Sequence, residues 1–426
     1  MEEYLKRLPP ELKEVISCSQ KVSERLGFRA YLVGGFVRDL ILGVPNLDMD
    51  IVIEGDGLKF AEELCAILNA KLTRHRRFGT ATITAPGNFK IDVATARKET
   101  YAHPAALPNV TAGDIQDDLL RRDFTINAMA ISISSSDFGK FVDFFGGKSD
   151  LMHGHIRVMH DLSFIDDPTR ILRAIRFEQR YHLKIETHTY KLLKSALERN
   201  MLEAVDKQRI RDELILMLKE NEPIRYIKRA NKLLGLSFIS PKIRFTKSLA
   251  AQLYKVEKEI NWFKSAFPRK RLIDAWLLYL IVLLKRLKKR EVLSFANRYA
   301  LRTGEVKRII SFEENFDRLN CRLNKKDIRP SRIYRLLEPL SYEVIILIKA
   351  VSKRRLVKKH IADFLKVYNG MRLHVNGEDL KKMGLKPGPS FKKLLLKLLY
   401  AKIDYGLKTR EEELNFISGK FLKESR

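Results

Sequence analysis

The sequence has few cysteines, no long apolar run and no repeat at a fixed period. Its three cysteines, Cys18, Cys65 and Cys321, lack Cys-x-x-Cys spacing, which disfavours a disulfide framework and a zinc site. The longest wholly apolar run, Ala275 to Leu284, has ten residues, whereas a membrane span needs roughly 18. The N-terminal residues are charged and lack the apolar core of a signal peptide. We therefore predict a cytoplasmic protein without a membrane partner.

Positive charge is abundant. The 426 residues include 81 Lys and Arg against 52 Asp and Glu, which gives a net charge of +29. This excess indicates a polyanionic partner, and its spread along the chain argues against a single basic tail. Solvated lysine-rich helices are the alternative. The length allows two to four domains.

The chain is organised around the stretch YLVGGFVRDLILGVPNLDMDIVI, residues 31–53. Its pattern predicts a strand, a two-glycine turn, a short helix and a second strand, at Tyr31–Val33, Gly34–Gly35, Phe36–Leu42 and Leu47–Ile53. Strand alternation then points Asp48 and Asp50 to one face, while Leu47 and Met49 point to the other.

Two carboxylates held this close repel each other unless a divalent cation neutralises them. Mg²⁺ suits Asp48 and Asp50, because it takes one or two carboxylates and completes its shell with water and phosphates. Without side chains, Gly34 and Gly35 let backbone N–H groups approach a phosphate at the start of the helix. The pattern therefore indicates a nucleoside triphosphate bound through metal ions. A hairpin turn beside a solvated strand edge is the alternative.

A third carboxylate lies on a later strand. After a helix at Gly57–Ala70, we expect strands near Lys71–Thr73, Thr80–Thr84 and Phe89–Thr95. Asp92 is flanked there by Ile91 and Val93, and it is a candidate to accept the proton of an attacking hydroxyl or to hold a metal. An outward-facing polar residue on an edge strand is the alternative.

The next segment combines a predicted loop with a charged helix. Residues 97–117 contain two prolines and few periodic apolar residues, so we expect a mobile loop. Leu119–Ala130 is predicted to be helical. Arg121 and Arg122 suit triphosphate oxygens, and Asp123 and Asn127, four apart, suit a ribose hydroxyl.

Asp166–Arg180 is predicted to be a helix with three arginines on one side. Asp167 is a good N-cap, and Arg170, Arg173 and Arg176 recur every three residues, where they need negative charge alongside. Asp167 and Arg170 together offer an acceptor and donors that match the edge of a nucleobase. A capping pair with solvated arginines is the alternative.

From Leu192 onward the pattern is helical, with proline breaks and recurrent basic patches, at Lys285–Arg290, Arg322–Arg335 and Lys353–His360. Aromatic residues do not interleave with these patches, so contact with a duplex backbone is a more natural use than stacking on single strands.

Several ordered motifs resemble those of one family, the class II nucleotidyltransferases of the DNA polymerase β superfamily, specifically bacterial tRNA CCA-end-forming enzymes and their poly(A) polymerase relatives. The matching segments are Leu32–Ile53, Ile91–Thr95, Arg121–Ala130, Gly146–Leu151, Asp166–Phe177 and Arg209–Leu214. The resemblance implies an α+β fold: a small β-sheet head over residues 1–140, then an all-helical neck (141–220), body (221–330) and tail (331–426).

The resemblance also implies roles for individual residues. Asp48 and Asp50 would hold Mg²⁺, Arg122 and Asp123 would bind the triphosphate and ribose of CTP or ATP, and Asp167 and Arg170 would select the base. The other residues assigned to nucleotide binding are Gly34, Gly35, Arg38, Asp39, Asn127, Arg173 and Arg176. The acceptor arm of tRNA would lie along the basic neck, body and tail. The oligomeric state is left open, with a monomer favoured.

Two departures from the family pattern bear on the product. The base-selecting motif begins Asp166-Asp167 where Glu-Asp is common, and the centre of residues 97–117, HPAALPNV, is less basic than in many complete CCA-adding relatives. That segment is associated in the family with the change from C to A addition. An enzyme that adds only A or only CC is therefore one expectation. A poly(A) polymerase and a non-catalytic RNA-binding protein are the alternatives.

Overall fold

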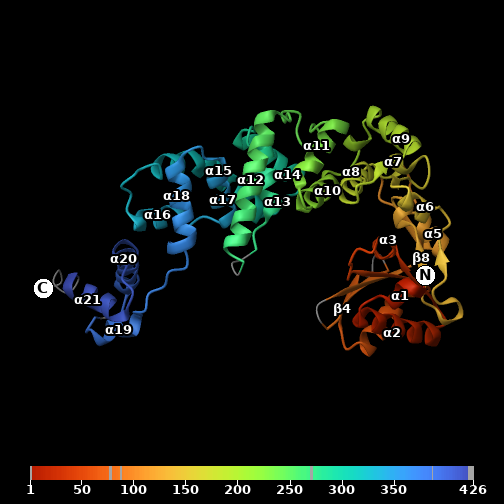
Figure 1. The fold of residues 1–426 in the computed structure, drawn as a ribbon, viewed down its shortest axis with the longest axis horizontal. Coiled ribbons are helices and arrows are strands. Elements are labelled where there is room, and N and C mark those ends of the chain that lie inside the picture. The colour runs from red at the N-terminus through yellow and green to blue at the C-terminus, as the bar shows by residue number, and fades with distance from the viewer. Residues whose placement is uncertain (1, 76–78, 87–88, 269–271, 386, 421–426) are drawn as a thin grey trace. The chain divides into compact units, whose positions relative to one another are not determined.

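The computed structural model describes residues 2–75, 79–86, 89–268, 272–385 and 387–420. It divides into two compact units, Met1–Leu234 and Gly235–Arg426. In Figure 1 the first runs from red to yellow-green and the second from green to blue. The first unit holds a mixed sheet and the described part of the second is helical, which confirms the predicted α+β class. The finer division into head, neck, body and tail stays a prediction.

A seven-stranded sheet forms the base of the first unit, in the order β3-β4-β5-β2-β1-β8-β9. Its strands are β1 (Arg29–Val33), β2 (Met49–Glu54), β3 (Lys71–His75), β4 (Thr80–Thr84), β5 (Lys90–Thr95), β8 (Ala130–Ser132) and β9 (Phe141–Val142). Only the β2–β5 pairing is parallel; the other neighbours are antiparallel. The parallel pair places the beginnings of β2 and β5, with their acidic residues, at the same edge of the sheet.

Helices cover this sheet and continue beyond it. They are α1 (Glu2–Lys6), α2 (Pro10–Leu26), α3 (Gly34–Leu42), α4 (Gly57–Ile67), α5 (Ile115–Leu120), α6 (Gly147–Met152), α7 (Ser163–Asp166), α8 (Arg170–Arg180), α9 (Thr187–Glu198), α10 (Lys207–Lys219) and α11 (Pro223–Leu234). On α2 the buried residues include Leu12, Val15, Ile16 and Val22. On α8 they include Ile171, Leu172 and Ile175.

The second strand begins later than predicted. β2 starts at Met49, so Asp48 lies in the preceding loop and only Asp50 lies on the strand. The prediction that Leu47 faces the core is wrong, because 54% of Leu47 is exposed. Strand alternation was extended two residues too far, into a loop that the strand periodicity does not describe.

Residues 97–117 are not a single loop. β6 (Arg97–Thr100) and β7 (Asn109–Ala112) form a two-stranded antiparallel sheet, and α5 begins at Ile115. The side chains of these strands are charged or small, so no apolar alternation signals them. Their stability comes from backbone pairing and from an ion pair between Arg97 and Glu99 at 2.8 Å.

The helix predicted at Leu119–Ala130 is also wrong. α5 ends at Leu120, a single 3₁₀ turn spans Thr125–Asn127, and β8 begins at Ala130. The apolar residues between Phe124 and Ile131 are all fully buried, because the segment passes through the core. A run buried on every side carries no periodicity that separates helix from strand.

The described part of the second unit is built from helices: α12 (Lys247–Ala266), α13 (Ala275–Leu284), α14 (Lys289–Arg298), α15 (Thr303–Arg322), α16 (Pro330–Leu337), α17 (Tyr342–Val351), α18 (Arg355–Asp363), α19 (Gly377–Lys382), α20 (Pro389–Tyr405) and α21 (Arg410–Lys420), with a π-helical turn at Phe364–Tyr368. The apolar run at Ala275–Leu284 is α13, buried from Trp276 to Leu284. Within the described residues, no helix is long and apolar enough to cross a membrane.

Candidate active site

Two carboxylates lie next to each other on the parallel strands. Asp50 on β2 is directly opposite Asp92 on β5, and Asp92 is in turn opposite Thr82 on β4. The Thr82 hydroxyl donates a hydrogen bond of 2.6 Å to Asp92 Oδ1, which fixes one oxygen of that carboxylate. The predicted proximity of Asp92 to the paired acids is therefore confirmed for Asp50.

Asp48 approaches from the loop before β2. It is exposed, and its backbone N–H donates to Asn46 Oδ1 at 2.9 Å. Its charge nevertheless reaches Asp50, because it contributes to the raised pKa of that residue. The acids therefore gather at one edge of the sheet, although Asp48 and Asp50 do not share a strand.

Asp50 is held in an unfavourable environment for a carboxylate. Burial, together with the negative charges of Asp92 and Asp48, raises the pKa of Asp50 to about 6, against the opposing influence of Arg122 and Arg38. Asp50 is thus largely ionised at neutral pH but at a free-energy cost to the fold. A cation bound between the acids would remove that cost.

The acids fit a magnesium ion that shares its ligands with a substrate. Carboxylate oxygens are suitable donors, and Mg²⁺ ordinarily binds through one or two of them plus phosphates and water. Among the residues that the structure describes, no three His, Cys, Asp or Glu side chains converge closely enough to hold a metal by themselves. Asp48, Asp50 and Asp92 would therefore supply only part of a coordination shell.

Gly34 brings the chain close to the acids. Its φ of +67° is a conformation that residues with a Cβ rarely adopt. A Cβ at this position would lie 2.5 Å from Arg122 Nη1 and 3.6 Å from Asp50 Oδ2. Glycine is therefore required both by the backbone conformation and by the approach of these two side chains.

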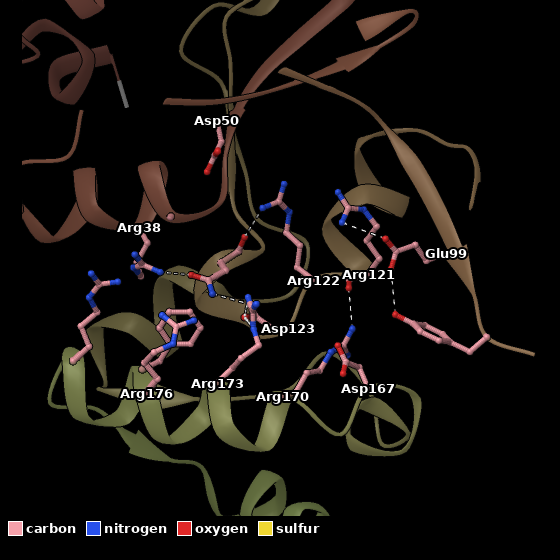
Figure 2. Close-up of a pocket in the computed structure, with 15 residues that line it drawn as sticks. Arg38, Asp50, Glu99, Arg121, Arg122, Asp123, Asp167, Arg170, Arg173 and Arg176 are labelled. Carbon is pink, nitrogen blue, oxygen red and sulfur yellow. Dashed lines mark hydrogen bonds and ion pairs between the residues drawn. The ribbon is translucent and has the colours of Figure 1, made fainter. Parts of the chain in front are cut away.

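A cavity of about 450 Å³ opens beside Asp50 (Figure 2). Seven arginines and four carboxylates line it, so the lining carries net positive charge and suits a polyanion. Eleven of the residues predicted to form the site line this cavity: Gly35, Arg38, Asp50, Arg121, Arg122, Asp123, Asn127, Asp167, Arg170, Arg173 and Arg176. Gly34, Asp39, Asp48 and Asp92 are not among the lining residues and lie in contact with them or at the sheet edge.

Arg38 is buried and held by several partners. Its guanidinium donates to Asp39 Oδ1 at 2.7 and 2.9 Å and to the Asn127 side chain, and it contacts the Tyr181 hydroxyl. It also lies 4.2 Å from the centre of the Tyr181 ring. Sequence reasoning missed Tyr181, which follows the predicted arginine helix.

Asp123 binds protein groups on both sides. Arg173 donates to Asp123 Oδ2 at 2.6 and 2.9 Å, and Asn127 donates to Oδ1 at 2.9 Å (Figure 2). Burial alone would raise its pKa, but Arg173 and Asn127 outweigh this and lower the pKa of Asp123 to about 2. The side chains of Asp123 and Asn127 do meet, although through a 3₁₀ turn and not along a helix.

The arginine row on α8 has the negative charge that its spacing demanded. Arg173 lies 3.4 Å from Glu213, a residue of α10, and Arg176 lies 3.4 Å from Glu213 and 3.7 Å from Glu220. Arg170 instead donates to the Arg121 carbonyl at 2.9 Å. Protein carboxylates therefore neutralise much of this row before any ligand binds.

The prediction that Asp167 is the N-cap of the arginine helix is wrong, because α8 begins at Arg170 and Thr169 occupies the N-cap position; Asp167 lies in the turn before it. Its Oδ1 accepts from the Thr169 backbone at 3.0 Å and from the Thr169 hydroxyl at 2.6 Å. The same oxygen lies 2.8 Å from an Arg209 amino group. Asp167 is thus paired with Arg209 and not with Arg170, although both Asp167 and Arg170 face the cavity (Figure 2).

Sequence reasoning missed other residues of the cavity wall: Glu99, Tyr101, Phe177 and Arg180. Glu99 and Tyr101 come from β6 and its following loop, and the Tyr101 hydroxyl donates to Glu99 at 3.1 Å. Burial and the charge of Glu99 raise the pKa of Tyr101 to about 12. In the sequence, the alternation of Arg97 and Glu99 was the one signal that β6 could contribute to the cavity wall.

The first unit thus combines a mixed sheet, neighbouring acids at its edge and an arginine-lined cavity. The sequence of the poly A polymerase head domain family matches residues 30–157. The A-adding tRNA nucleotidyltransferase of Halalkalibacterium halodurans is 32% identical over 412 residues, which cover 93% of this chain and 90% of the relative. The chain belongs to the class II tRNA nucleotidyltransferase family.

Two further similarities extend over most of the chain. The A-adding tRNA nucleotidyltransferase of Geobacter sulfurreducens is 36% identical over 92% of this chain. This chain spans only 45% of that relative, and 43% of a similar one from Aquifex aeolicus. The solved structure of the Thermotoga maritima CCA-adding enzyme complexed with tRNA matches with a TM-score of 0.70 and 36% identity, covering 99% of this chain and 98% of that one.

A methyl group at Gly34 should disrupt the site. Both Gly34 and Gly43 have a φ of +67°, but a Cβ at Gly43 meets nothing within 4 Å. Gly43→Ala should therefore lower the free energy of unfolding by about 1–2 kcal/mol through strain alone. Gly34→Ala should lower it by about 1–3 kcal/mol more, because Arg122 must move. Urea unfolding of both variants measures the difference; equal losses would contradict the close packing.

Asp50→Asn should stabilise the metal-free protein at high pH. Since the folded-state pKa of about 6 lies above the ordinary 3.8, Asp50 has no effect on stability below pH 4, and its destabilising effect grows as the pH rises to 6 and is fully present above it. The variant should gain up to about 3 kcal/mol at pH 8 and nothing at pH 4. Unfolding of the chelator-treated protein at both pH values tests this. Glu24→Gln, an exposed acid on α2, is the control, and a loss of stability at pH 8 would contradict the assignment.

Proposed function

We propose that this protein transfers a nucleotidyl group to the 3′ hydroxyl of a tRNA. The proposal is carried by the position of the acids at the edge of an arginine-lined cavity. Asp50, whose pKa is raised, belongs to the group of acids and also lines the cavity. In the reaction the hydroxyl oxygen forms a bond to the α-phosphorus of a nucleoside triphosphate, the bond to the β-phosphate bridge breaks, and pyrophosphate leaves.

Asp48 and Asp50 are the residues that would hold Mg²⁺, with Asp92 beside them. When bound, the ion would neutralise phosphate oxygens and bring the hydroxyl near the phosphorus. Asp92 is placed to accept the hydroxyl proton or to complete the metal shell. The protein's own contribution is alignment and charge neutralisation, not a covalent intermediate.

The arginine-lined cavity would take the nucleotide. Arg122, next to Gly34 and Asp50, is assigned to the triphosphate, and Asp123 with Asn127 to the ribose end. Asp167 and Arg170 are assigned to the base, for which they present a carboxylate acceptor and guanidinium donors. Since Asp167 is paired with Arg209 and Arg170 with a carbonyl, both are held in fixed orientations before the base arrives.

ATP is the favoured donor, because the relatives from Geobacter and Halalkalibacterium carry A-adding names. The acceptor would be a tRNA that already ends in both Cs. Its duplex arm would contact the basic helices through phosphates, in keeping with the charge of +29. The cytoplasmic location and the monomeric state belong to the same proposal. A poly(A) polymerase, which would extend many RNAs by long tails, is the second candidate because of the head-domain match.

The proposal is tested with tRNAs that lack the whole CCA end, carry its first C, or carry both Cs, each offered every triphosphate separately. We expect one A on the tRNA ending in CC. An Asp48→Ala, Asp50→Ala double variant should lose incorporation at least 1,000-fold while keeping tRNA binding, since the metal is lost but the basic helices are not. Glu24→Ala, an exposed acid on α2, should transfer normally. Incorporation by the double variant would overturn the site, and long A tails would favour the poly(A) alternative.

Arg170 should control nucleotide choice. Arg170→Gln removes fixed donors, so selection of ATP over CTP, GTP and UTP should fall about 10-fold or more before transfer is abolished. Arg170→Lys keeps the charge but loses the planar, paired donors of the guanidinium, and it should also relax nucleotide selection. The ratios of kcat/KM for the four triphosphates measure this. Unchanged ratios in both variants would remove Arg170 from base recognition.

A further inference from the structure

A fully buried carboxylate on α5 forms ion pairs with two neighbouring arginines. Asp118 is 0% exposed. Its Oδ1 accepts hydrogen bonds from Arg121 at 2.5 and 3.0 Å, and its Oδ2 accepts one from Arg122 at 2.9 Å. The spacing of three and four residues brings these side chains together at the end of the helix. Both of its oxygens are therefore committed to the two arginines.

From its ion pair with Asp118, the Arg122 side chain extends toward Asp50. The point where a Gly34 Cβ would stand is 2.5 Å from Arg122 Nη1 and 3.6 Å from Asp50 Oδ2, so both groups border the same small space. Arg122 also donates to the Asn127 carbonyl at 3.5 Å. Its ion pair is nevertheless made with Asp118 and not with Asp50.

We infer that Asp118 is a positioning residue that holds Arg122 back from Asp50 and so keeps Asp50 available for a cation. The inference rests on the proposed function, in which Asp50 binds the metal and Arg122 the triphosphate. A guanidinium is always charged, and a partly buried one that loses its carboxylate pairs with the next acid within reach. For Arg122 that acid is Asp50.

Asp118 also supports the base-selecting end of the cavity. Besides its bonds to Asp118, Arg121 lies 3.5 Å from Glu99 of the β6–β7 hairpin. The backbone carbonyl of Arg121 accepts the hydrogen bond from Arg170. One buried carboxylate therefore orders both the arginine beside the metal site and the peptide group that orients Arg170.

The test is direct binding of Mn²⁺, a spectroscopic substitute for Mg²⁺, to the full chain. Asp118→Asn keeps the shape but removes the charge, so Arg122 should pair with Asp50 and the affinity for Mn²⁺, followed by electron paramagnetic resonance, should fall at least 10-fold. The metal concentration that gives half-maximal A addition should rise by a similar factor. Unchanged Mn²⁺ affinity would overturn the inference.

Asp150→Asn is the matched control. Asp150 is also buried, and it holds Arg157 at 2.8 Å and the Thr125 hydroxyl at 2.7 Å without lining the cavity. Its loss should lower the melting temperature as Asp118→Asn does, but leave Mn²⁺ affinity within 2-fold of the wild type. An equal fall in affinity for both variants would mean that general destabilisation, not positioning, explains the effect.

A double variant separates restraint from structural damage. In Asp118→Asn, Arg122→Gln the guanidinium that Asp118 would have restrained is absent, so Mn²⁺ affinity should return to that of Arg122→Gln alone. A double variant as weak as Asp118→Asn would overturn the inference. If Asp118→Asn does not fold, Asp118→Glu, compared with Asp150→Glu, gives the same measurement. Failure of the wild type to extend any tRNA would instead reject the proposed function.

Discussion

The site depends on keeping opposite charges apart in a small, partly buried space. Burial, with the negative charges of Asp92 and Asp48, raises the pKa of Asp50, while arginines line the cavity beside it. Collapse of the arginines onto the acids would satisfy both sets and leave nothing to bind. The structure prevents this by giving each arginine another acceptor. Arg38 has Asp39, Arg121 and Arg122 share Asp118, and Arg173 has Asp123. Arg176 pairs with Glu213 on α10, and Arg170 donates to a backbone carbonyl.

The sheet makes this separation rigid. Because β2 and β5 are parallel and in register, Asp50 and Asp92 are fixed side by side by backbone hydrogen bonds and cannot relax apart. The arginines come from elements that do not belong to this pair, namely α3, the turn after α5 and α8. The acids and the arginines therefore approach the cavity from different secondary-structure elements. The distance between them is set by how these elements pack in the first unit.

The sequence predicts the acids better than their surroundings. Two-residue spacing placed Asp50 on a strand, and the apolar neighbours of Asp92 placed it inside the sheet, because both signals are local. The resemblance to a family then supplied the roles of Asp167 and Arg170. Asp118 went unnoticed, although helical spacing relates it to both arginines. Arg209 and Glu213 lie in the segment Arg209–Leu214 that resembles the family, but they were assigned no role. Arg209 and Glu213 meet the cavity only through packing of α10 on α8, which no local pattern encodes.

The errors have a common physical cause. Residues 97–117 were predicted to be a loop because paired strands with charged side chains show no apolar alternation, and Leu119–Ala130 was predicted to be a helix because a segment buried on all sides shows no period. Asp123 and Asn127 were nonetheless expected to meet, and they do so across the 3₁₀ turn. A four-residue separation brings side chains together in more than one backbone geometry.

The pairing pattern also indicates which arginine groups remain to bind a nucleotide. In the described part of the chain, Arg122 Nε, Arg170 Nη1, Arg176 Nε and Arg209 Nη1 are buried without a hydrogen-bond acceptor. A buried N–H without an acceptor costs about 1–3 kcal/mol, so each of these groups favours a ligand that supplies an oxygen or ring nitrogen. Arg173 already donates two hydrogen bonds to Asp123, so few of its N–H groups are available to a ligand. Among the residues that line the cavity, Arg122 beside Asp50 and Arg170 therefore keep N–H groups for a ligand. A ligand that reached both would be elongated, acidic at one end and rich in hydrogen-bond acceptors at the other, as a nucleoside triphosphate is.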